Sequence, residues 1–338
     1  MRNSKKNNDK IAIILPNRVG DSILTLPLLV CLNNLISSYG PEGRTYRAYS
    51  AIPLGPVFEA VGEAGLMPMG WGAKIRSWVN PPDKAFFLIA TTKNFAFSAT
   101  EKYGIYQPNK PFVRYSHDLP SLIGNGPSPE LRSYLLDRCQ LNDYSINMFG
   151  VIEALGYSVQ QVIESFSFSR DSLPVDRSSF NWQIPVQEPY VVCCMEAAYG
   201  SKIRNADRRW NSDHFLSIAR RITDDYQCKV VFIGLDREPP LPQVDSFIDL
   251  RITLNLWQLF QLMSRASGYL GNDTGPLHLA NLAGIPSVGI YARDDIRYPL
   301  FNDLNTVLVR PKDPENVYAA TRLMLDSSRD LMSSLLTI

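Results

Sequence analysis

The stretch that decides the fold is GYLGNDTGPLHL, at residues 268–279. Its first letters are typical of a buried strand, and PLHLANLAG (276–284) has the apolar content and length of a helix. Gly271 and Gly275 permit close backbone approach or a positive φ between the two, and Pro276 suits the first helical position. We therefore predict a strand that turns sharply into a helix.

The polar residues of this turn have two interpretations. Thr274 is placed to cap the helix, and the N–H groups and positive dipole end of a helix start attract an anion such as a diphosphate. His278, in the first turn, would add a donor. A purely structural cap formed by Asp273 and Thr274 explains the local pattern equally well. The turn alone therefore does not decide between a cap and a binding site.

The alternation of strand and helix extends outward in both directions. Before the turn lie a strand YVVCCM (190–195), a helix SDHFLSIARRI (212–222), a strand CKVVFIG (228–234) and a helix LNLWQLFQLMSRA (254–266); after it lies the strand IPSVGIYA (285–292). Strands and helices that alternate over short connections are typical of βαβ units. The pattern predicts an α/β fold with a parallel sheet covered by helices on both faces.

The N-terminal half begins in the same way. KIAIIL (10–15) predicts a buried strand, a loop PNRVGDS follows, and a helix is expected from about residue 26, with Asp21 in or just after the loop. Residues 133–156 predict one helix that ends at Gly156, whereas residues 40–130 show no clean periodicity.

A linker divides the chain into two domains. Residues 167–189 hold three prolines and lack periodicity, and a chain of 338 residues exceeds the usual span of one domain. We predict domains over 1–180 and 181–338. A closing helix over about 313–328, with Asp313 as N-cap and Pro314 as its first residue, either stays with the second domain or packs back onto the first.

The composition excludes several classes of protein. A net charge of +1 is too small for a nucleic-acid partner, and five cysteines without a CxxC pair form neither a disulfide framework nor a zinc site. The early apolar run IAIIL is too short for a secretory signal, and no window approaches the roughly 18 apolar residues of a membrane span. We expect a cytoplasmic protein for which contact with a membrane surface stays open.

Two loops after predicted strands carry candidate binding residues. The segment EAAYGSKIRNADRRW (196–210) brings several cations ahead of a helix start, which suits either a clamp for phosphate oxygens or a solvated loop. These cations are Lys202, Arg204, Arg208 and Arg209. Glu238, a few residues beyond a strand, either accepts hydrogen bonds from ribose hydroxyls or lies in solvent.

Asp21 stands at the end of the first strand beside Gly20. A carboxylate at that position can act as the general base for a hydroxyl, or it can cap the nearby helix. The sequence contains no DxD pair, no GxGxxG or GxxxxGK[ST] after a strand, and only three widely spaced histidines. The usual metal and nucleotide motifs are therefore absent from the sequence.

Together, these stretches resemble glycosyltransferase family 9, the heptosyltransferase family of bacterial lipopolysaccharide core assembly. RVGDSILTLPLL near the start, RRWNSDHFLSIARRI in the middle and GNDTGPLHLANLAGIPSVGIY towards the end carry the likeness, in the family's order and approximate spacing. The resemblance implies the GT-B architecture: two Rossmann-like domains with parallel sheets that face each other across a cleft. The N-terminal domain would bind the acceptor and the C-terminal domain the nucleotide sugar.

The resemblance also assigns roles to residues. Asp21 matches the general base that deprotonates the acceptor hydroxyl, with Arg18 and Gly20 beside it in the cleft. Arg208 stands where the family usually has a lysine on the diphosphate, so the charge is kept but the geometry differs. The implied donor-binding set is Lys202, Arg208, Arg209, Glu238, Asp273, Thr274, Gly275 and His278.

The function that the resemblance implies is an inverting glycosyl transfer without a metal or other cofactor. A sugar, with heptose from an ADP-linked donor as the first candidate, would move to a hydroxyl of a glycan or lipid-linked oligosaccharide in lipopolysaccharide core or related surface glycan synthesis. A lipid-linked acceptor would bring the enzyme to the inner face of the cytoplasmic membrane. One alternative is a catalytically silent protein that binds sugar nucleotides or glycans, which would not need Asp21. Another is a sugar-nucleotide epimerase or phosphorylase.

Overall fold

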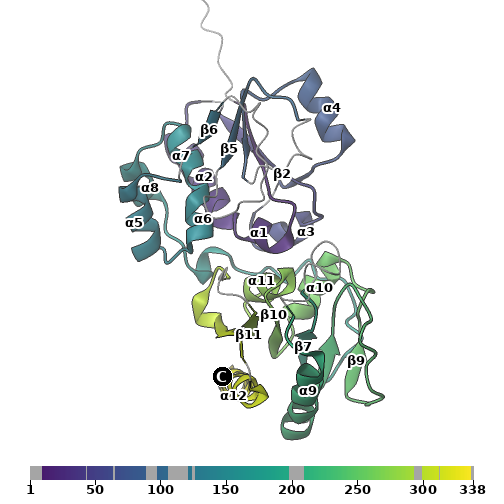
Figure 1. Ribbon diagram of the computed structural model, residues 1–338. Coiled ribbons are helices and arrows are strands. Elements are labelled where there is room, and N and C mark those ends of the chain that lie inside the picture. The colour runs from purple at the N-terminus through teal and green to yellow at the C-terminus, as the bar shows by residue number, and fades with distance from the viewer. Residues whose placement is uncertain are drawn as a thin grey trace, which may run out of the picture. The chain divides into compact units, whose positions relative to one another are not determined.

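The computed structural model describes residues 10–42, 44–63, 65–88, 97–105, 121–123, 126–197, 209–292, 299–311 and 313–335. The chain divides into two compact units, Met1–Asp176 and Arg177–Ile338. Each unit is built on its own six-stranded sheet (Figure 1). The division falls inside the stretch 167–189, where the prolines stand.

Unit 1 contains a parallel sheet in the order β3-β2-β1-β4-β5-β6. Its strands are β1 (Lys10–Ile14), β2 (Thr45–Ser50), β3 (Met67–Pro68), β4 (Lys84–Phe87), β5 (Glu101–Ile105) and β6 (Ser121–Ile123). β1 lies in the middle and pairs with β2 from Lys10↔Thr45 and with β4 from Ile11↔Lys84. The strand predicted from KIAIIL is thus confirmed as the centre of this sheet.

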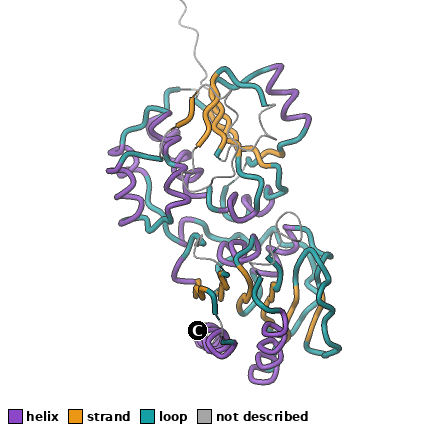
Figure 2. Tube along the Cα trace, in the orientation of Figure 1, coloured by secondary structure: helices purple, strands orange, loops and turns teal. Residues whose placement is uncertain are grey.

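Helices cover both faces of this sheet. They are α1 (Val19–Ile23), α2 (Leu26–Tyr39), α3 (Gly55–Glu59), α4 (Trp71–Val79), α5 (Pro129–Asp137), α6 (Asp143–Met148), α7 (Gly150–Ala154) and α8 (Val159–Ser165), with a 3₁₀ turn at Arg170–Ser172. Figure 2 shows α5 to α8 gathered on one flank of the strands, with α4 on the other side. Ala12 and Ile14 of β1 form one cluster with Ala73 of α4, so Ile11 and Ile13 point to the opposite face.

The helix expected over 133–156 is instead three short helices, α5, α6 and α7. The break comes at Gln140, whose φ of 53° is left-handed, and at Asn142, whose side-chain oxygen accepts a hydrogen bond from Ser145 N at 2.9 Å. An N-cap of this kind starts a new helix rather than continuing an old one. Gly156 does end the series, with a φ of 86°.

Unit 2 contains a second parallel sheet, in the order β12-β11-β10-β7-β8-β9. Its strands are β7 (Tyr190–Cys194), β8 (Lys229–Phe232), β9 (Phe247–Asp249), β10 (Gly268–Asn272), β11 (Ser287–Tyr291) and β12 (Asn305–Val309). Its helices are α9 (Ser212–Tyr226), α10 (Leu256–Met263), α11 (Gly275–Leu282) and α12 (Pro314–Leu335), with a 3₁₀ turn at Asn302–Leu304. Every strand and helix predicted around the turn at 268–279 is present.

One face of this second sheet carries the main core of unit 2. Phe215, Ile218 and Ile222 of α9 pack with Val317 of α12 against the inward side chains of β7, β8, β10 and β11. Asp313 caps α12, because its Oδ1 accepts from Glu315 N at 2.9 Å. The described part of α12 thus packs on the sheet of its own unit, which is one of the two placements considered from the sequence.

The two sheets share one strand order. When the strands of each unit are numbered from one, both sheets run 3-2-1-4-5-6, the order of a dinucleotide-binding Rossmann fold. The predicted α/β class with two Rossmann-like domains is therefore confirmed. In such sheets the chain reverses its winding between strands 1 and 4, and ligands bind beyond the carboxyl ends of those two strands. These places are β1/β4 in unit 1 and β7/β10 in unit 2.

Contrary to the expectation from the sequence, one described helical stretch, Val19–Tyr39, is long and apolar enough by composition to cross a membrane. It comprises α1 and α2, and 72% of its most apolar window is buried inside the protein. Leu28, Leu32 and Leu35 of α2 are fully covered. We assign this stretch to the core of unit 1.

Candidate active site

In unit 2, the turn at 271–275 leaves β10 at the point where the sheet reverses its winding. A Cβ built at Gly271 would overlap the hydroxyl of Tyr269 and lie 2.8 Å from the carbonyl oxygen of Cys194 on β7. The close approach of the backbone therefore requires glycine at position 271. This is one of the two reasons, close approach or a positive φ, that the sequence suggests for this glycine. The backbone then continues to α11, with Asp273 N donating to Ile290 O at 2.9 Å.

Asn272 ties this turn to the loop that follows β7. Its side chain is fully buried; Nδ2 donates to Met195 O at 2.7 Å, and Oδ1 accepts from Trp210 N at 3.0 Å. One amide thus joins the ends of β7 and β10 to the start of α9. The bond to Met195 is buried and the bond from Trp210 is partly buried, so replacing the amide would leave a backbone acceptor and a backbone donor without these partners.

α11 begins at this edge with half-buried residues. Thr274 occupies the N-cap position, but its hydroxyl donates to Asn272 O at 3.2 Å and makes no capping bond to the helix. The predicted side-chain cap by Thr274 is therefore wrong, although the helix does start there. The initial N–H groups of a helix have no intrahelical carbonyl to bind. Together with the helix dipole they leave this end suited to an anion.

Trp210 anchors the segment in front of α9. Its indole Nε1 donates to Pro311 O at 2.8 Å, and its ring packs edge-on to Phe215 at 5.0 Å between centroids. Arg209, next to it, is exposed at the same edge. Lys202, Arg204 and Arg208 lie outside the described residues, so the proposed phosphate clamp stays a prediction.

A buried carboxylate that follows β7 holds the loop that leaves β8. Glu196, only 6% exposed, accepts a hydrogen bond from Leu235 N at 2.8 Å through Oε2. A Cβ at Gly234 would lie 2.8 Å from the other carboxylate oxygen. Glu196 therefore fixes the path of the chain that leaves β8.

Glu238 lies farther along this loop and is exposed. The loop is held by Arg251, which is 2% exposed and donates to Pro239 O at 2.7 Å and to both carboxylate oxygens of Asp249 at 2.9 and 2.8 Å. Hydrogen bonding to Asp249 raises the pKa of Arg251, so the guanidinium stays charged. The position of Glu238 at the carboxyl edge is compatible with a ribose contact, which stays a prediction.

His278 and Asp273 complete the predicted donor set in unit 2. His278 is 5% exposed on α11, and Asp273 is half-buried at the turn. The structure thus brings Asp273, Thr274, Gly275 and His278 together at one helix start. It does not test their roles.

In unit 1, Asp21 occupies the equivalent edge, beyond β1. It lies within the short helix α1, which begins inside the predicted loop at 16–22, and is 5% exposed. Arg18, at the N-cap of α1, brings its Nε to 3.9 Å from Asp21 Oδ2, and Gly20 is buried between them. Ser22 Oγ donates to Pro16 O at 2.7 Å and holds α1 against the end of the strand.

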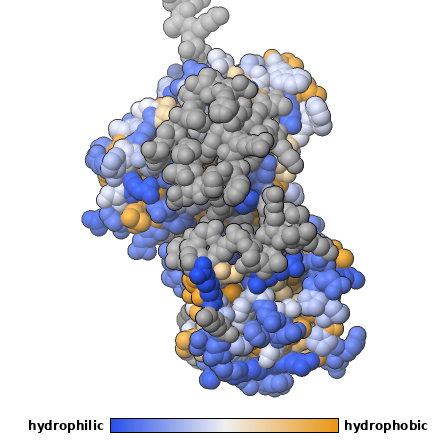
Figure 3. Space-filling model, in the orientation of Figure 1, coloured by the Kyte–Doolittle hydropathy of each residue, from blue (hydrophilic) through white to orange (hydrophobic). Residues whose placement is uncertain are grey.

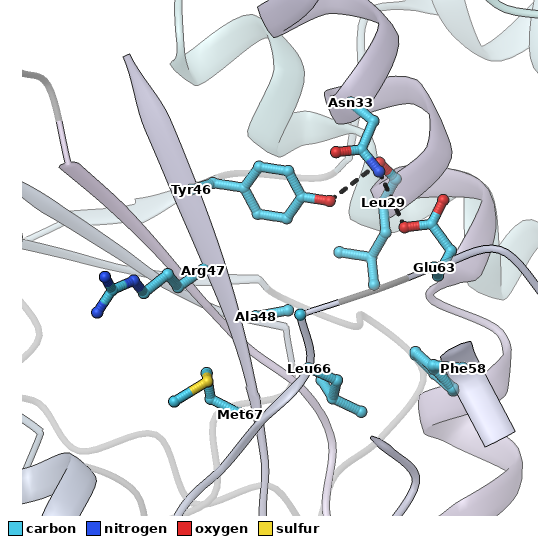
Figure 4. A pocket seen from close by; sticks show the side chains of 10 residues that line it. Leu29, Asn33, Tyr46, Arg47, Ala48, Phe58, Glu63, Leu66 and Met67 are labelled. Carbon is cyan, nitrogen blue, oxygen red and sulfur yellow. Dashed lines mark hydrogen bonds between the residues drawn. The ribbon is translucent and has the colours of Figure 1, made fainter. Parts of the chain in front are cut away.

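A cavity of about 360 Å³ lies elsewhere in unit 1, beside the amino-terminal half of β2 (Figure 4). Asn33 Nδ2 donates to Glu63 Oε2 at 3.0 Å in its wall, and Tyr46 Oη donates to Leu29 O at 3.4 Å. Burial raises the pKa of Glu63 to about 7. Since Asp21 follows the carboxyl end of β1, this cavity is separate from the predicted base.

The cysteines are not suited to act as nucleophiles at the carboxyl edges of the two sheets. All five are free and buried, and burial raises the pKa of Cys194 to about 11. A thiol of this kind is not ionised at neutral pH. Among the described ranges, no group of three or more His, Cys, Asp or Glu side chains is assembled as for a metal ion.

Comparison with known proteins identifies the family. The profile of glycosyltransferase family 9 (heptosyltransferase) matches residues 145–321, more than half of the 338 residues. The chain belongs to glycosyltransferase family 9. It is accordingly a glycosyltransferase, as predicted. No curated protein gives a significant match to the sequence.

Solved heptosyltransferases share the fold of this family 9 glycosyltransferase. ADP-heptose lipopolysaccharide heptosyltransferase II of E. coli is 16% identical, with a TM-score of 0.63 over 95% of this chain and 99% of that one. A family 9 glycosyltransferase of Veillonella parvula is 16% identical, with a TM-score of 0.59 over 94% and 90%. The E. coli heptosyltransferase WaaC, solved with ADP-2-deoxy-2-fluoro heptose, is 12% identical, with a TM-score of 0.59 over 94% and 99%. At these identities the likeness concerns the fold.

Proposed function

We propose that this glycosyltransferase is inverting and works without a metal, and that it moves heptose from ADP-heptose to a glycan hydroxyl in lipopolysaccharide core or related surface glycan synthesis. The observation that carries the proposal is the turn at 271–275, which the buried Asn272 holds at the β7/β10 reversal with a helix start behind it. The ADP-heptose donor is suggested by the related heptosyltransferases and by the family.

The reaction we propose forms one bond and breaks one. The acceptor oxygen attacks the anomeric carbon from the side opposite the nucleotide, its proton passes to the Asp21 carboxylate, and the bond to the diphosphate oxygen breaks with its electron pair on ADP. Negative charge then grows on the leaving diphosphate. We assign the stabilisation of that charge to the start of α11 and to the cations Lys202, Arg208 and Arg209, in the place of a metal ion.

The assignment of the remaining residues follows the same chemistry. We assign Asp273, just before the N-cap of α11, and His278, on that helix, to the donor sugar, and Glu238 to the ribose. Arg18 and Gly20 stand beside Asp21 on the acceptor side. Localisation at the inner face of the cytoplasmic membrane belongs to the proposal as well, because a lipid-linked acceptor would be found there.

The experiment that tests the donor is thermal unfolding in the presence of ADP, UDP, GDP and CDP, followed by ADP-heptose. A ligand that binds only the folded state raises the melting temperature. We expect ADP to raise it and the other diphosphates to raise it much less. Stabilisation by UDP alone would replace the donor, and no stabilisation by any nucleotide would contradict the transferase proposal. Binding of ADP-heptose without transfer to any glycan would favour the silent alternative.

A further inference from the structure

The helix α4 of unit 1 packs on its sheet through small residues. Ala73 and Ser77, one turn apart, are each 2% exposed. Ala73 contacts the cluster of Ala12, Ile14 and Phe87, while Ser77 Oγ accepts from Ser98 N at 2.9 Å. The inward face of α4 therefore contains no large apolar side chain.

The large apolar side chains of α4 point outward. Trp71, Ile75, Trp78 and Val79 are 76%, 52%, 59% and 81% exposed. Their spacing of i, i+4, i+7 and i+8 places them in one stripe along the helix. Figure 3, in the orientation of Figure 1, shows hydrophobic surface where α4 lies. We call these four side chains the α4 patch.

This arrangement reverses the usual amphipathic helix. A surface helix of a soluble domain buries its large apolar residues and exposes polar ones. Contiguous exposed apolar side chains instead mark a surface that meets a protein or a membrane. The α4 patch lowers solubility and contributes nothing to the core of unit 1. We therefore expect another surface to cover it.

Cations surround the α4 patch. Lys74 Nζ lies 5.5 Å from the centre of the Trp71 ring, and Arg76 is exposed in the next turn. At the far end of the helix, Lys10 Nζ donates to Asn80 Oδ1 at 3.1 Å. The helix sequence WGAKIRSWV contains no acidic residue.

We propose that the α4 patch docks this protein on the surface of a bilayer that contains anionic lipid. Indole rings favour the boundary between headgroups and acyl chains, where the ring is apolar and its N–H stays hydrated. Lysine and arginine at the same depth bind anionic headgroups. A short helix with two tryptophans, two aliphatic residues and two cations matches that environment.

The bilayer fits the patch better than a second copy of the chain does. Two indoles and two aliphatic side chains expose on the order of 500 Å² at the observed fractions. A stable protein interface buries about 800 Å² on each partner. Lys74 and Arg76, which flank the stripe, would also meet the same cations in a symmetric pair. Bilayer binding needs neither a larger area nor an opposite charge on a second protein.

The patch lies on the same unit as the predicted base. α4 starts just after β3, at the carboxyl edge where Asp21 stands, and ends beside Lys10 at the amino edge. A protein docked through α4 would therefore hold the acceptor edge of unit 1 close to the membrane. This purpose rests on the proposed lipid-linked acceptor, whereas binding to lipid does not, so the two can fail separately.

The test is flotation of the full chain with vesicles of phosphatidylcholine and phosphatidylglycerol, and with vesicles of phosphatidylcholine alone. We expect binding to the anionic vesicles, with a blue shift of tryptophan emission. W71A/W78A should weaken it at least about tenfold, because two indoles leave the bilayer. K74E and R76E should each weaken it by roughly fivefold or more. The control is L136A, which removes a side chain 50% exposed on α5 of the same unit and should bind as the parent does.

Three results would overturn the inference: no binding by the parent protein, equal binding by W71A/W78A and the parent, or loss of binding in L136A as well. Sedimentation velocity tests whether a second copy of the chain, rather than a bilayer, covers the patch. A dimer that W71A/W78A abolishes, without vesicle binding, would assign the patch to a second copy. The replaced side chains are exposed or, for Lys74, half-buried, so melting temperature and ADP-induced stabilisation should match the parent and report that the variants fold. Failure of ADP to bind would concern the proposed donor and not the patch.

Discussion

Glu63 lends itself to a quantitative test because its carboxyl is buried without a cation partner among the described residues. It is 7% exposed, and burial raises its pKa from 4.5 to about 7 while the hydrogen bond from Asn33 opposes that rise. The rise of this pKa from 4.5 to about 7 corresponds to about 3 kcal/mol of free energy, because each tenfold change in proton affinity is worth about 1.4 kcal/mol. The folded state thus binds this proton more tightly than the unfolded chain does.

The sign follows from the raised pKa. Below about pH 4.5 both states are protonated and Glu63 costs nothing; stability falls as the pH rises towards 7, and above that the full penalty of about 3 kcal/mol applies. Glu63→Gln keeps the shape and the acceptor for Asn33 but cannot ionise. We expect it to be about 2 to 3 kcal/mol more stable than the parent at pH 8 and equal to it near pH 4.

The assay is urea unfolding followed by circular dichroism from pH 4 to 8.5. Glu59→Gln, four residues away on an exposed carboxylate, is the control and should track the parent at every pH. The difference between Glu63→Gln and the parent cancels all other titrating groups. If that difference stayed constant over the whole pH range, the burial of Glu63 as the origin of its raised pKa would be refuted.

The remaining predictions concern the candidate active site. Gly271→Ala should lower the free energy of unfolding by about 3 kcal/mol, since the new Cβ meets the Cys194 carbonyl oxygen at 2.8 Å and the Tyr269 hydroxyl. Adding Tyr269→Phe to this variant should restore part of that loss. If the effects of the two substitutions in urea unfolding were strictly additive, the overlap with the Tyr269 hydroxyl would be contradicted. Asn272→Ala should cost about 2 kcal/mol, because a buried backbone carbonyl and a partly buried N–H lose their partners, and should weaken ADP binding measured by calorimetry; unchanged stability would remove Asn272 from its linking role. Asp21→Asn should leave ADP affinity intact while turnover of the donor drops by roughly 10² to 10⁴, and retained turnover would exclude Asp21 as the base.

The parts of the fold that the sequence predicted are those set by local pattern. β1 and β7 are runs of β-formers, β10 is a short stretch directly before a turn, and the apolar stripe of α9 repeats at helical spacing. β2 and β3 escaped prediction for a physical reason. TYRAYS mixes exposed and buried positions, and β3 has only two residues, so both are strands because a neighbouring strand pairs with them.

The candidate site divides in the same way. Gly271 could be placed from the sequence, because a glycine between strand and helix has a local cause. The function of Asn272 could not, because its partners Met195 and Trp210 stand 77 and 62 residues away. α4 also could not be predicted from its sequence. Its residues have the spacing of an amphipathic helix, but which stripe faces the sheet depends on how closely the helix approaches β1. Only the folded chain shows that approach.

Each sheet takes its six strands from one continuous stretch of chain, and α12 stays with the sheet of its own unit. The polypeptide therefore crosses from one unit to the other once, between Asp176 and Arg177. A break at that junction would leave every strand pair intact. An isotope-labelled half can therefore be ligated to an unlabelled one at this junction, so that the signals of one unit are observed at a time.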